Sequence, residues 1–367
     1  MDDKISYDNA PWWSHIPGSK RLLRDFGLAR STLYLLESWP LQILNRTVTG
    51  RWSQDFFPPA DFTEAVVKAG RELIEKDAAR ASQGLFPLSL LKPEPVGRHL
   101  LSLVGVLGDS VRVAWRMRNN QHDDLENVKS DELASLPDYY RRNFHFQSDG
   151  YLSASSAARY EHQVEILFKG AAGAMRRLAL VPLVARYREM TSTQNEQQIP
   201  RLIELGAGSG GATLQVAASL PNMRLTAVDL SADYLQHARK TLSQHRNVDF
   251  VQGDGASLNF KDETFNGGFS VFMFHELPRQ TREMVLKEAF RVLKPGGQFV
   301  VVDSLQWDDK PELNWGLERF PQDFHEPFYK NYVKTPLDEL FAKAGFEVVH
   351  QELGLLAKCI VGEKPSA

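Results

Sequence analysis

The chain has 367 residues, a formal net charge of −3 and 43% hydrophobic residues, as in an ordinary soluble globular protein. This composition excludes a largely disordered chain and argues against a generally basic, nucleic-acid-binding one. The length predicts more than one folding unit. The single cysteine, Cys359, excludes an internal disulfide, and no run of about 18 apolar residues predicts a transmembrane segment. We therefore expect a cytoplasmic protein, for which peripheral contact with a membrane is left open.

Residues 1 to about 190 are predicted to be mostly helical. Apolar residues recur at helical spacing in ADFTEAVVKAGRELIEKDAARA and VGRHLLSLVGVLGDSVRVAWRMR, without strand-like alternation. The polar, proline-closed stretch TSTQNEQQIP at 191–200 predicts a linker. We divide the chain into a helical N-terminal domain (1–135), a helical covering segment with linker (136–195) and an α/β domain (196–367). The N-terminal domain carries no motif, and could shape a pocket, form a homodimer, or bind a protein or membrane.

After the linker, short apolar runs alternate with helical patterns, which predicts a parallel α/β sheet. The runs are RLIEL, MRLTAVDL, VDFVQGD, GGFSVFMF and GQFVVVDS. Two more runs, FEVVHQEL and LLAKCIVGE, follow a helix at 336–344 and predict an antiparallel end of the sheet. Ligands of doubly wound sheets lie outside the carboxyl ends of the strands, so the residues after each strand are binding candidates.

The first strand is followed by ELGAGSGG, which places Gly206, Gly208 and Gly211 in G-x-G-x-x-G spacing before a helix. Glycines at this turn let a ligand approach the amides of the helix N-terminus. The pattern alone is weak, because dinucleotide-binding enzymes share it.

Three carboxylates accompany the glycine turn. Glu204 precedes the glycines, Asp229 ends the second strand, and Asp254 follows the third. Asp229 could accept hydrogen bonds from two ribose hydroxyls, and Asp254 from an adenine amino group. Taken singly, Asp229 could instead be a helix N-cap and Asp254 a turn residue. Their joint occurrence behind successive strands favours a nucleotide site.

Together with an LKPGG turn before the fifth strand, these motifs resemble those of the class I S-adenosylmethionine-dependent methyltransferases, in particular the small-molecule branch of the ubiquinone and menaquinone type. The resemblance covers residues 200–362. It implies a Rossmann-like, seven-stranded sheet of order 3-2-1-4-5-7-6, with strand 7 antiparallel, and S-adenosylmethionine as cofactor. One departure is Gly268, at or beside which many members carry an aspartate.

Cofactor-binding candidates come from the strand ends and from the covering segment. They are Glu204, Gly206, Ala207, Gly208, Asp229, Leu230, Asp254, Gly255, Ala256, Phe274, Tyr151 and Tyr160. The tyrosines are proposed because related enzymes lay a helix from before the first strand over the methionine end of the cofactor. An interdomain helix capped by serine is an equal alternative for that stretch.

The predicted activity is methyl transfer to a small apolar or aromatic molecule, with catalysis mainly by positioning. His275 is a candidate general base, because an unperturbed imidazole is largely neutral at pH 7. The aromatic-rich insert at 305–336 adds Tyr329 and His325 as catalytic candidates. We expect this insert and residues 139–170 to meet over the methyl group. Helix capping and plain aromatic packing are the structural alternatives.

The sequence also bears on alternative functions, on metal binding and on partners. A non-catalytic regulator or scaffold that binds S-adenosylmethionine is the main alternative. Nucleic-acid methylation is disfavoured, because FHELP stands where an N/D-P-P-Y/F motif is needed and no domain is basic. No metal site is expected, since histidines, Cys359 and carboxylates show no ligand spacing. The expected partners are a small-molecule substrate and a second copy bound through the helical domain.

Overall fold

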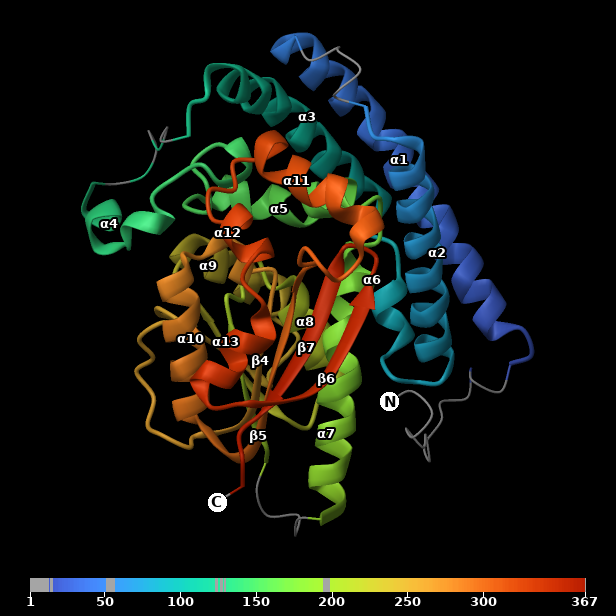
Figure 1. The fold of residues 1–367 in the computed structure, drawn as a ribbon. Helices are drawn as coiled ribbons and strands as arrows, with labels where there is room; N and C mark the ends of the chain where they lie inside the picture. Colours follow the sequence, from blue (N-terminus) through green and yellow to red (C-terminus); the bar gives the residue numbers. More distant parts are fainter. Residues whose placement is uncertain are drawn as a thin grey trace.

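The computed structural model describes residues 13, 16–50, 57–122, 125, 128, 130–193 and 199–366. Seven strands form one sheet of order β3-β2-β1-β4-β5-β7-β6 (Figure 1). The predicted order is therefore confirmed. The strands are β1 (Arg201–Leu205), β2 (Arg224–Asp229), β3 (Val248–Gln252), β4 (Phe265–Val271), β5 (Leu293–Ser304), β6 (Glu347–Gly354) and β7 (Ala357–Glu363).

Strand directions also agree with the prediction. The pairs from β3 through β5 are parallel, whereas β7 runs antiparallel to both β5 and β6. Most residues of β1, β2, β4, β5 and β7 are buried, as expected for strands covered on both faces. The LKPGG stretch, predicted as a turn, is the beginning of β5, where the pairing with β4 shifts register.

The core lies on both faces of the sheet, because successive side chains of a strand point to opposite sides. Leu202 of β1 belongs to the cluster under α7 (Leu180–Thr193) and α8 (Gly211–Ser219). Ile203 belongs to the opposite cluster, under α10 (Arg279–Val292) and α13 (Leu337–Ala344). Helix α9 (Ala232–Thr241) packs against β2 and β3. The predicted linker meets the end of α7, and its residues 194–198 lie outside the described residues.

The packing around Gly268 explains why this position lacks the aspartate that many members of the family carry. A Cβ at this position of β4 would lie 2.8 Å from Ile203 Cγ2 and 3.0 Å from a ring atom of Phe299. The neighbouring strands therefore leave no room for an aspartate side chain.

Helices precede the sheet, as predicted, in the part of the chain that the structure describes. They are α1 (Ser19–Thr49), α2 (Ala60–Ser82), α3 (Val96–Asn119), α4 (Ser130–Ser135), α5 (Ala154–Leu167) and α6 (Ala172–Arg176). Short 3₁₀ turns occur at Leu88–Leu91, Asp138–Tyr140, Phe144–Phe146, Arg177–Ala179, Phe274–Glu276 and Pro311–Leu313. No described helix is long and apolar enough to cross a membrane.

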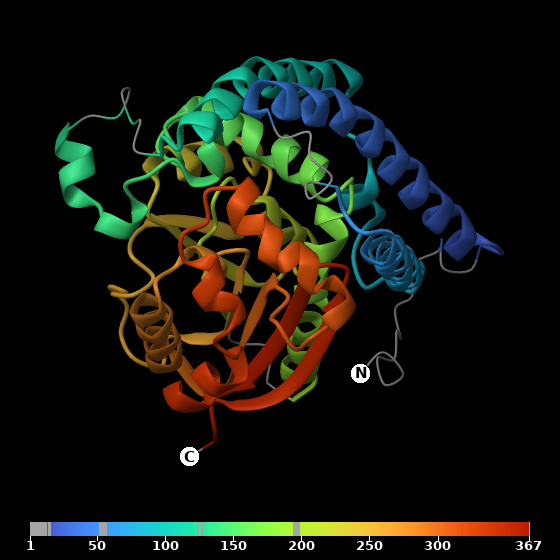
Figure 2. The ribbon, with the colours of Figure 1, turned by 45° about the horizontal axis from the view of Figure 1, so that its top comes forward.

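The first helices form a layer over the strand ends. Both α1 and α3 pack on α5, and Figures 1 and 2 show them outside it. The layer is tied to the sheet by α2, since Arg80 donates to both oxygens of Glu352 in β6 at 2.9 and 2.8 Å. Asp77 accepts two hydrogen bonds of 2.7 Å from Arg177. A bidentate pair such as Arg177 with Asp77 fixes relative orientation as well as contributing energy.

The insert at 305–336 is largely helical. It contains α11 (Asn314–Asp323) and α12 (Tyr329–Val333), whose apolar side chains join the core beneath α10 and α13. Aromatic residues in this insert therefore serve packing in part, the structural alternative considered above.

Candidate functional site

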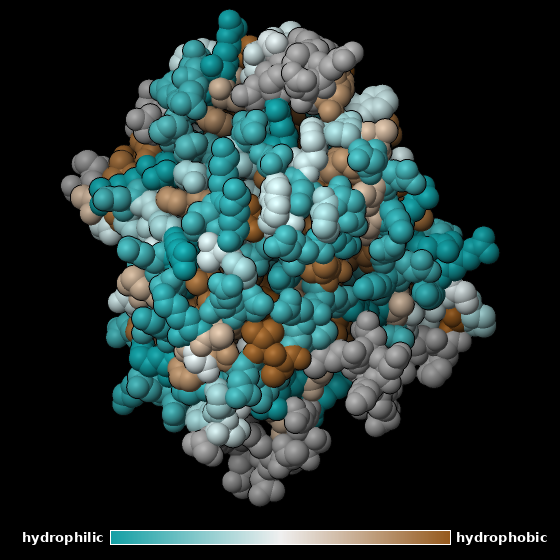
Figure 3. Space-filling view, viewed as in Figure 1, coloured by the Kyte–Doolittle hydropathy of each residue, from teal (hydrophilic) through white to brown (hydrophobic). Residues whose placement is uncertain are grey.

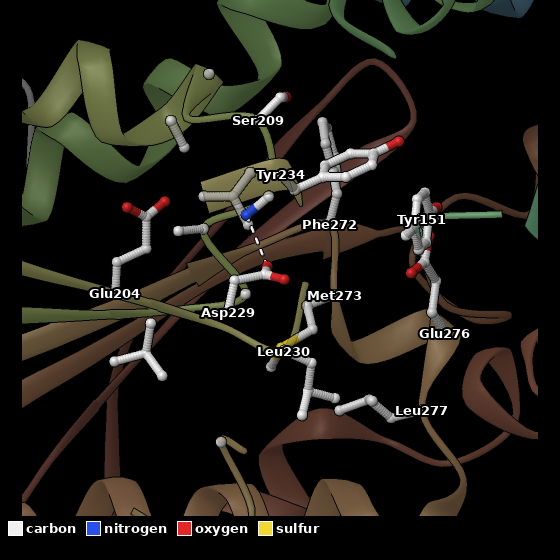
Figure 4. A pocket seen from close by; sticks show the side chains of 18 of the residues that line it. Tyr151, Glu204, Ser209, Asp229, Leu230, Tyr234, Phe272, Met273, Glu276 and Leu277 are labelled. Atoms are coloured by element: carbon white, nitrogen blue, oxygen red, sulfur yellow. Dashed lines mark hydrogen bonds between the residues drawn. The ribbon is translucent and has the colours of Figure 1, made fainter. Parts of the chain in front are cut away.

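A cleft opens at the carboxyl ends of β1, β2, β3 and β4, where the sequence predicts a ligand (Figure 4). The turn after β1 forms one wall. Gly206 and Gly208 have φ of 76° and 53°, in the left-handed region that favours glycine. A Cβ at Gly206 would lie 2.6 Å from Met273 Sδ, whereas one at Gly208 would meet no atom within 4 Å. The backbone at Gly208 is therefore open to a ligand.

Asp229 links the glycine turn to the next strand end. Its carboxylate accepts hydrogen bonds from the amides of Gly208 at 2.7 Å and Ser231 at 2.8 Å. Ser231, and not Asp229, caps α9, because its hydroxyl accepts from the Tyr234 amide. Burial raises the pKa of Asp229 to about 6, although these two amides oppose the shift. The carboxylate remains mostly ionised at pH 7 and has further lone pairs for hydroxyl donors.

Glu204 and Asp254 lie beside the cleft with different partners. Glu204 is 1% exposed and accepts a 2.6 Å hydrogen bond from the Thr213 hydroxyl. Burial raises the pKa of Glu204 to about 8. Asp254 lines the cleft and also accepts from the Ala256 amide at 2.8 Å, so its turn role and its binding position coexist.

Two charged residues of the cleft wall were missed by the sequence reasoning. Glu161 of α5 accepts from the Ser209 hydroxyl at 2.5 Å and from Arg176 at 2.6 Å. Both Glu161 and Arg176 line the cleft. These contacts fasten the covering helix to the glycine turn, so the segment that holds Tyr160 is part of the site. No sequence spacing relates these residues, since their contacts arise only in the folded chain.

The cleft ends at Tyr151 and Glu276, far from Glu204 in the view of Figure 4. The Tyr151 hydroxyl donates to Glu276, an interaction the sequence did not suggest. Of the predicted cofactor residues, most line the cleft, namely Glu204, Gly206, Ala207, Gly208, Asp229, Leu230, Asp254, Gly255, Tyr151 and Tyr160. Ala256 and Phe274 do not line it. Phe274 is fully buried in the core, because the 3₁₀ turn points its ring inward.

A second cavity, the chamber, adjoins the cleft and shares Tyr160, Phe272 and Glu276 with it. Aromatic and aliphatic side chains dominate its remaining wall. These residues are His145, Val164, Leu167, Phe168, His275, Ser304, Gly316, Leu317, Phe320, Tyr329 and Leu356. The chamber therefore presents a mainly apolar space with a few polar points next to the cleft.

His275 lies in the chamber but is not the neutral imidazole that the sequence suggested. Its Nδ1 is 2.6 Å from Asp303 Oδ1, and Asp303 is fully buried. Burial favours the neutral ring, but the charge and hydrogen bond of Asp303 outweigh it and raise the pKa of His275 to about 10. At pH 7 His275 is therefore protonated, and the argument for it as a ready general base fails.

The insert and the covering segment meet, as expected. The ring of His145 lies 6.3 Å from that of Phe320 and 5.9 Å from that of Phe324. Tyr329 contacts Ser304 through its hydroxyl and lines the chamber. His325 lines neither cavity but stacks on His122 at 4.3 Å, and burial lowers its pKa to about 4. Its position therefore does not support a catalytic role.

Residues 202–297 match a family model described as a methyltransferase domain. This methyltransferase domain belongs to a sheet with the seven-stranded order that the class I resemblance predicted. Its cofactor is S-adenosylmethionine.

Two curated relatives match this methyltransferase domain. The chain is 32% identical over 133 residues to a fatty-acid O-methyltransferase of Mycolicibacterium smegmatis, covering 36% of this chain and 47% of the relative. It is 33% identical over 118 residues to a ubiquinone/menaquinone biosynthesis C-methyltransferase of Rhodopseudomonas palustris, covering 31% and 46%. The chain thus spans about half the length of these relatives. Among solved structures, the PH0226 protein of Pyrococcus horikoshii is 23% identical, with 58% and 94% coverage and a TM-score of 0.39.

The residues of the cleft fit this cofactor. Open space at Gly208 allows a ligand to approach the backbone, and Asp229 offers free lone pairs beside it. Arg176 and Glu161 supply one charge of each sign on the wall near the glycine turn, suited to an amino acid group. Tyr160, Phe272 and Glu276, which line both cavities, mark the passage toward the chamber.

Proposed function

We propose that the protein transfers a methyl group from S-adenosylmethionine to a small apolar acceptor held in the chamber. The observation that carries this proposal is the adjacency of the two cavities, which share Tyr160, Phe272 and Glu276. An acceptor in the chamber would therefore lie against the cofactor cleft. The whole cleft and chamber are formed by side chains from the methyltransferase domain, the covering segment and the insert.

When bound, the cofactor supplies an electrophilic methyl group on a sulfonium. The residues of this chain would position the partners, since methyl transfer to a held nucleophile depends mainly on near-attack geometry. Asp229 and the glycine turn would hold the nucleoside, while α5 and the insert exclude water from the chamber. The protonated His275 would donate a hydrogen bond to an acceptor oxygen, and its ring centroid lies 5.9 Å from that of Tyr329.

The acceptor that fits this wall is elongated and apolar. Beyond the chamber lies a third cavity, the groove, which shares His145, Tyr160, Val164 and Leu167 with the chamber. Most of its wall comes from α1, α3 and α5, with His145, Gln147, Lys169 and Phe324 completing it, and its surface is mainly apolar. The names of the two curated relatives, which act on a fatty acid or in quinone biosynthesis, are in line with an apolar acceptor. We propose a molecule with a polar head in the chamber and an apolar tail in the groove.

Two substitutions in the chamber test this function. We expect His275→Ala and Tyr329→Phe to reduce methyl transfer strongly while S-adenosylhomocysteine affinity stays within about threefold, because both residues face the acceptor and not the nucleotide. Transfer of labelled methyl to long-chain fatty acids and alkylphenols, extracted into organic solvent, measures the activity. Calorimetry measures the affinity, and Tyr187→Phe on α7 is the control.

Two results would contradict the proposal. If neither variant changes transfer from the wild-type rate, the chamber does not hold the acceptor. If the wild type binds S-adenosylhomocysteine but transfers methyl to no compound of these classes, an elongated apolar acceptor is wrong and the non-catalytic alternative is favoured.

A further inference from the structure

Three potential metal ligands from three separate segments converge at the edge of the chamber. They are His145 of the covering segment, Glu276 after β4 and Glu326 of the insert. His145 Nε2 lies 3.3 Å from Glu326 Oε1 and 3.6 Å from Glu276 Oε1. His275 Nε2 lies 3.8 Å from the same Glu276 oxygen. The three potential ligands are far apart in sequence, so their spacing could not reveal the cluster.

Glu326 points to a missing ligand. The residue is 2% exposed, and neither of its carboxylate oxygens accepts a hydrogen bond from any described residue. An ionised carboxylate buried in this way is costly unless a cation or hydrogen-bond donors satisfy it. The nearest cationic group is His145, which contacts the carboxylate as an ion pair only.

The distances suit a divalent metal ion. Bonds of about 2.0 to 2.2 Å in a tetrahedral zinc site separate neighbouring ligand atoms by roughly 3.4 Å. The separations of 3.3 and 3.6 Å between His145 and the two carboxylates are close to this value. The two carboxylates would also balance the charge of the ion, and a fourth position would be open to a further ligand.

The surroundings of the cluster resemble the outer shell of a metal site. Ligand carboxylates are usually hydrogen-bonded to groups outside the metal shell, and Tyr151 donates to Glu276. We propose that His145, Glu276 and Glu326 bind a divalent transition-metal ion of the zinc type. This proposal departs from the sequence-based expectation of no metal site.

The ion would face the space that the proposed function gives to the acceptor. There it could bind a hydroxyl or carbonyl oxygen of the acceptor and stabilise its anionic form, a Lewis-acid role. This role rests on the proposed function, whereas binding of the ion does not. A measurement of metal binding alone therefore separates the two proposals.

Metal titrations test the site. We expect chelator-treated protein to bind one equivalent of Zn²⁺ in calorimetry, and Co²⁺ to give the strong visible absorption of a tetrahedral site. Glu326→Gln and His145→Ala should each weaken Zn²⁺ binding by roughly tenfold or more, the scale seen when metal-site residues are altered. Circular dichroism establishes that each variant is folded. The matched control is His162→Ala in the cluster of Glu37, His99 and His162, the other such group among the described residues.

The alternative is a metal-free ion-pair cluster in which a protonated His145 bridges Glu276 and Glu326. Absence of Zn²⁺ binding to the folded wild type would establish the metal-free cluster and overturn the proposed metal site. Loss of binding in His162→Ala, with Glu326→Gln unaffected, would also overturn it, because the ion would then belong to the other cluster.

A second inference comes from the outer surface of the helical layer. Of the 20 large apolar side chains exposed among the described residues, 14 lie on α1 and α3. They are Leu22, Phe26, Leu33, Leu35, Leu36, Trp39, Ile43, Val96, Leu100, Leu101, Val104, Leu107, Val111 and Trp115. The side of the molecule seen in Figure 3, the view of Figure 1, is mostly hydrophilic with small apolar patches. Such a concentration marks an interaction surface.

Charge indicates the partner of this surface. Helices α1 and α3 carry nine Lys and Arg against three Asp and Glu, although the whole chain has a net charge of −3. Both helices pack on α5, so the apolar side chains that they expose lie on the outer side of the helical layer. Apolar side chains mixed with basic ones are typical of helices that lie on anionic membranes. A symmetric dimer through this surface would instead place two basic faces together.

We infer that α1 and α3 dock the protein on an anionic lipid bilayer without crossing it. The groove opens between these helices, lined by Leu41 and Asn45 of α1 and by Val106 and Val113 of α3. A bilayer at this surface would therefore lie next to the groove proposed for the acceptor tail. The docking itself does not depend on the proposed activity.

Vesicle sedimentation tests the docking. We expect binding to phosphatidylcholine vesicles that contain phosphatidylglycerol, weakening with salt, and little binding to phosphatidylcholine alone. Arg98→Gln with Arg112→Gln, and Leu101→Ser with Val104→Ser, should each weaken binding by roughly tenfold or more. Met284→Ser and Val349→Ser, at apolar sites exposed elsewhere, are the controls. Equal binding by all variants would overturn the inference, as would a stable dimer that both pairs of substitutions dissociate.

Discussion

Replacing Asp303 with alanine is expected to lower the free energy of unfolding by about 3 to 5 kcal/mol, the scale for removing one partner of a buried charge pair. Asp303 is fully buried at the end of β5 and accepts hydrogen bonds from the amides of Phe274 and Ser304, both at 2.7 Å. It also pairs with His275 at 2.6 Å. The substitution would leave a buried imidazole and two amides without their acceptor.

Urea unfolding measures this effect, with Asp303→Asn as the matched variant. Asparagine keeps one carbonyl oxygen as an acceptor, so we expect it to retain part of the stability that alanine loses. A loss below about 1 kcal/mol for Asp303→Ala, the net value of one ordinary hydrogen bond, would mean that Asp303 does not organise the turn after β4.

The second large effect is expected at Asp229. Asp229→Ala should weaken binding of S-adenosylhomocysteine by about 1 to 3 kcal/mol, because charge-assisted hydrogen bonds to the ribose are lost. The Gly208 amide would lose its 2.7 Å acceptor as well, which loosens the glycine turn. Calorimetry measures the change.

The control for Asp229 is Asp249→Ala on β3, where the carboxylate pairs with Arg224 on the exposed surface. It should leave the affinity unchanged, because this pair lies outside the cleft. An Asp229→Ala variant that binds as tightly as the wild type would remove Asp229 from the site.

The α/β part of the fold could be predicted because its signals are local. Buried parallel strands read as short apolar runs, and the turn after β1 requires glycines at Gly206 and Gly208. Asp229 was placed from its position at a strand end, and the structure puts it in the cleft. Residues next to a strand end can thus be located before the tertiary structure is known.

Other parts of the site could not be predicted because they form only by tertiary contact. Arg176 is held at the cleft by Glu161 of another helix. Glu326 contacts His145 although the two residues are 181 positions apart in the sequence. The charge state of His275 depends on Asp303, which a sequence cannot place beside it. Phe274 was assigned to the cofactor by its neighbourhood alone, yet its ring points into the core.

The central claim is that the strand-end cleft is an S-adenosylmethionine site and not a dinucleotide site. Calorimetric titration of the whole chain with S-adenosylhomocysteine and with NAD⁺ tests it most directly. The account predicts that one equivalent of S-adenosylhomocysteine binds and that NAD⁺ gives no saturable heat. Saturable binding of NAD⁺, with none of S-adenosylhomocysteine, would contradict it.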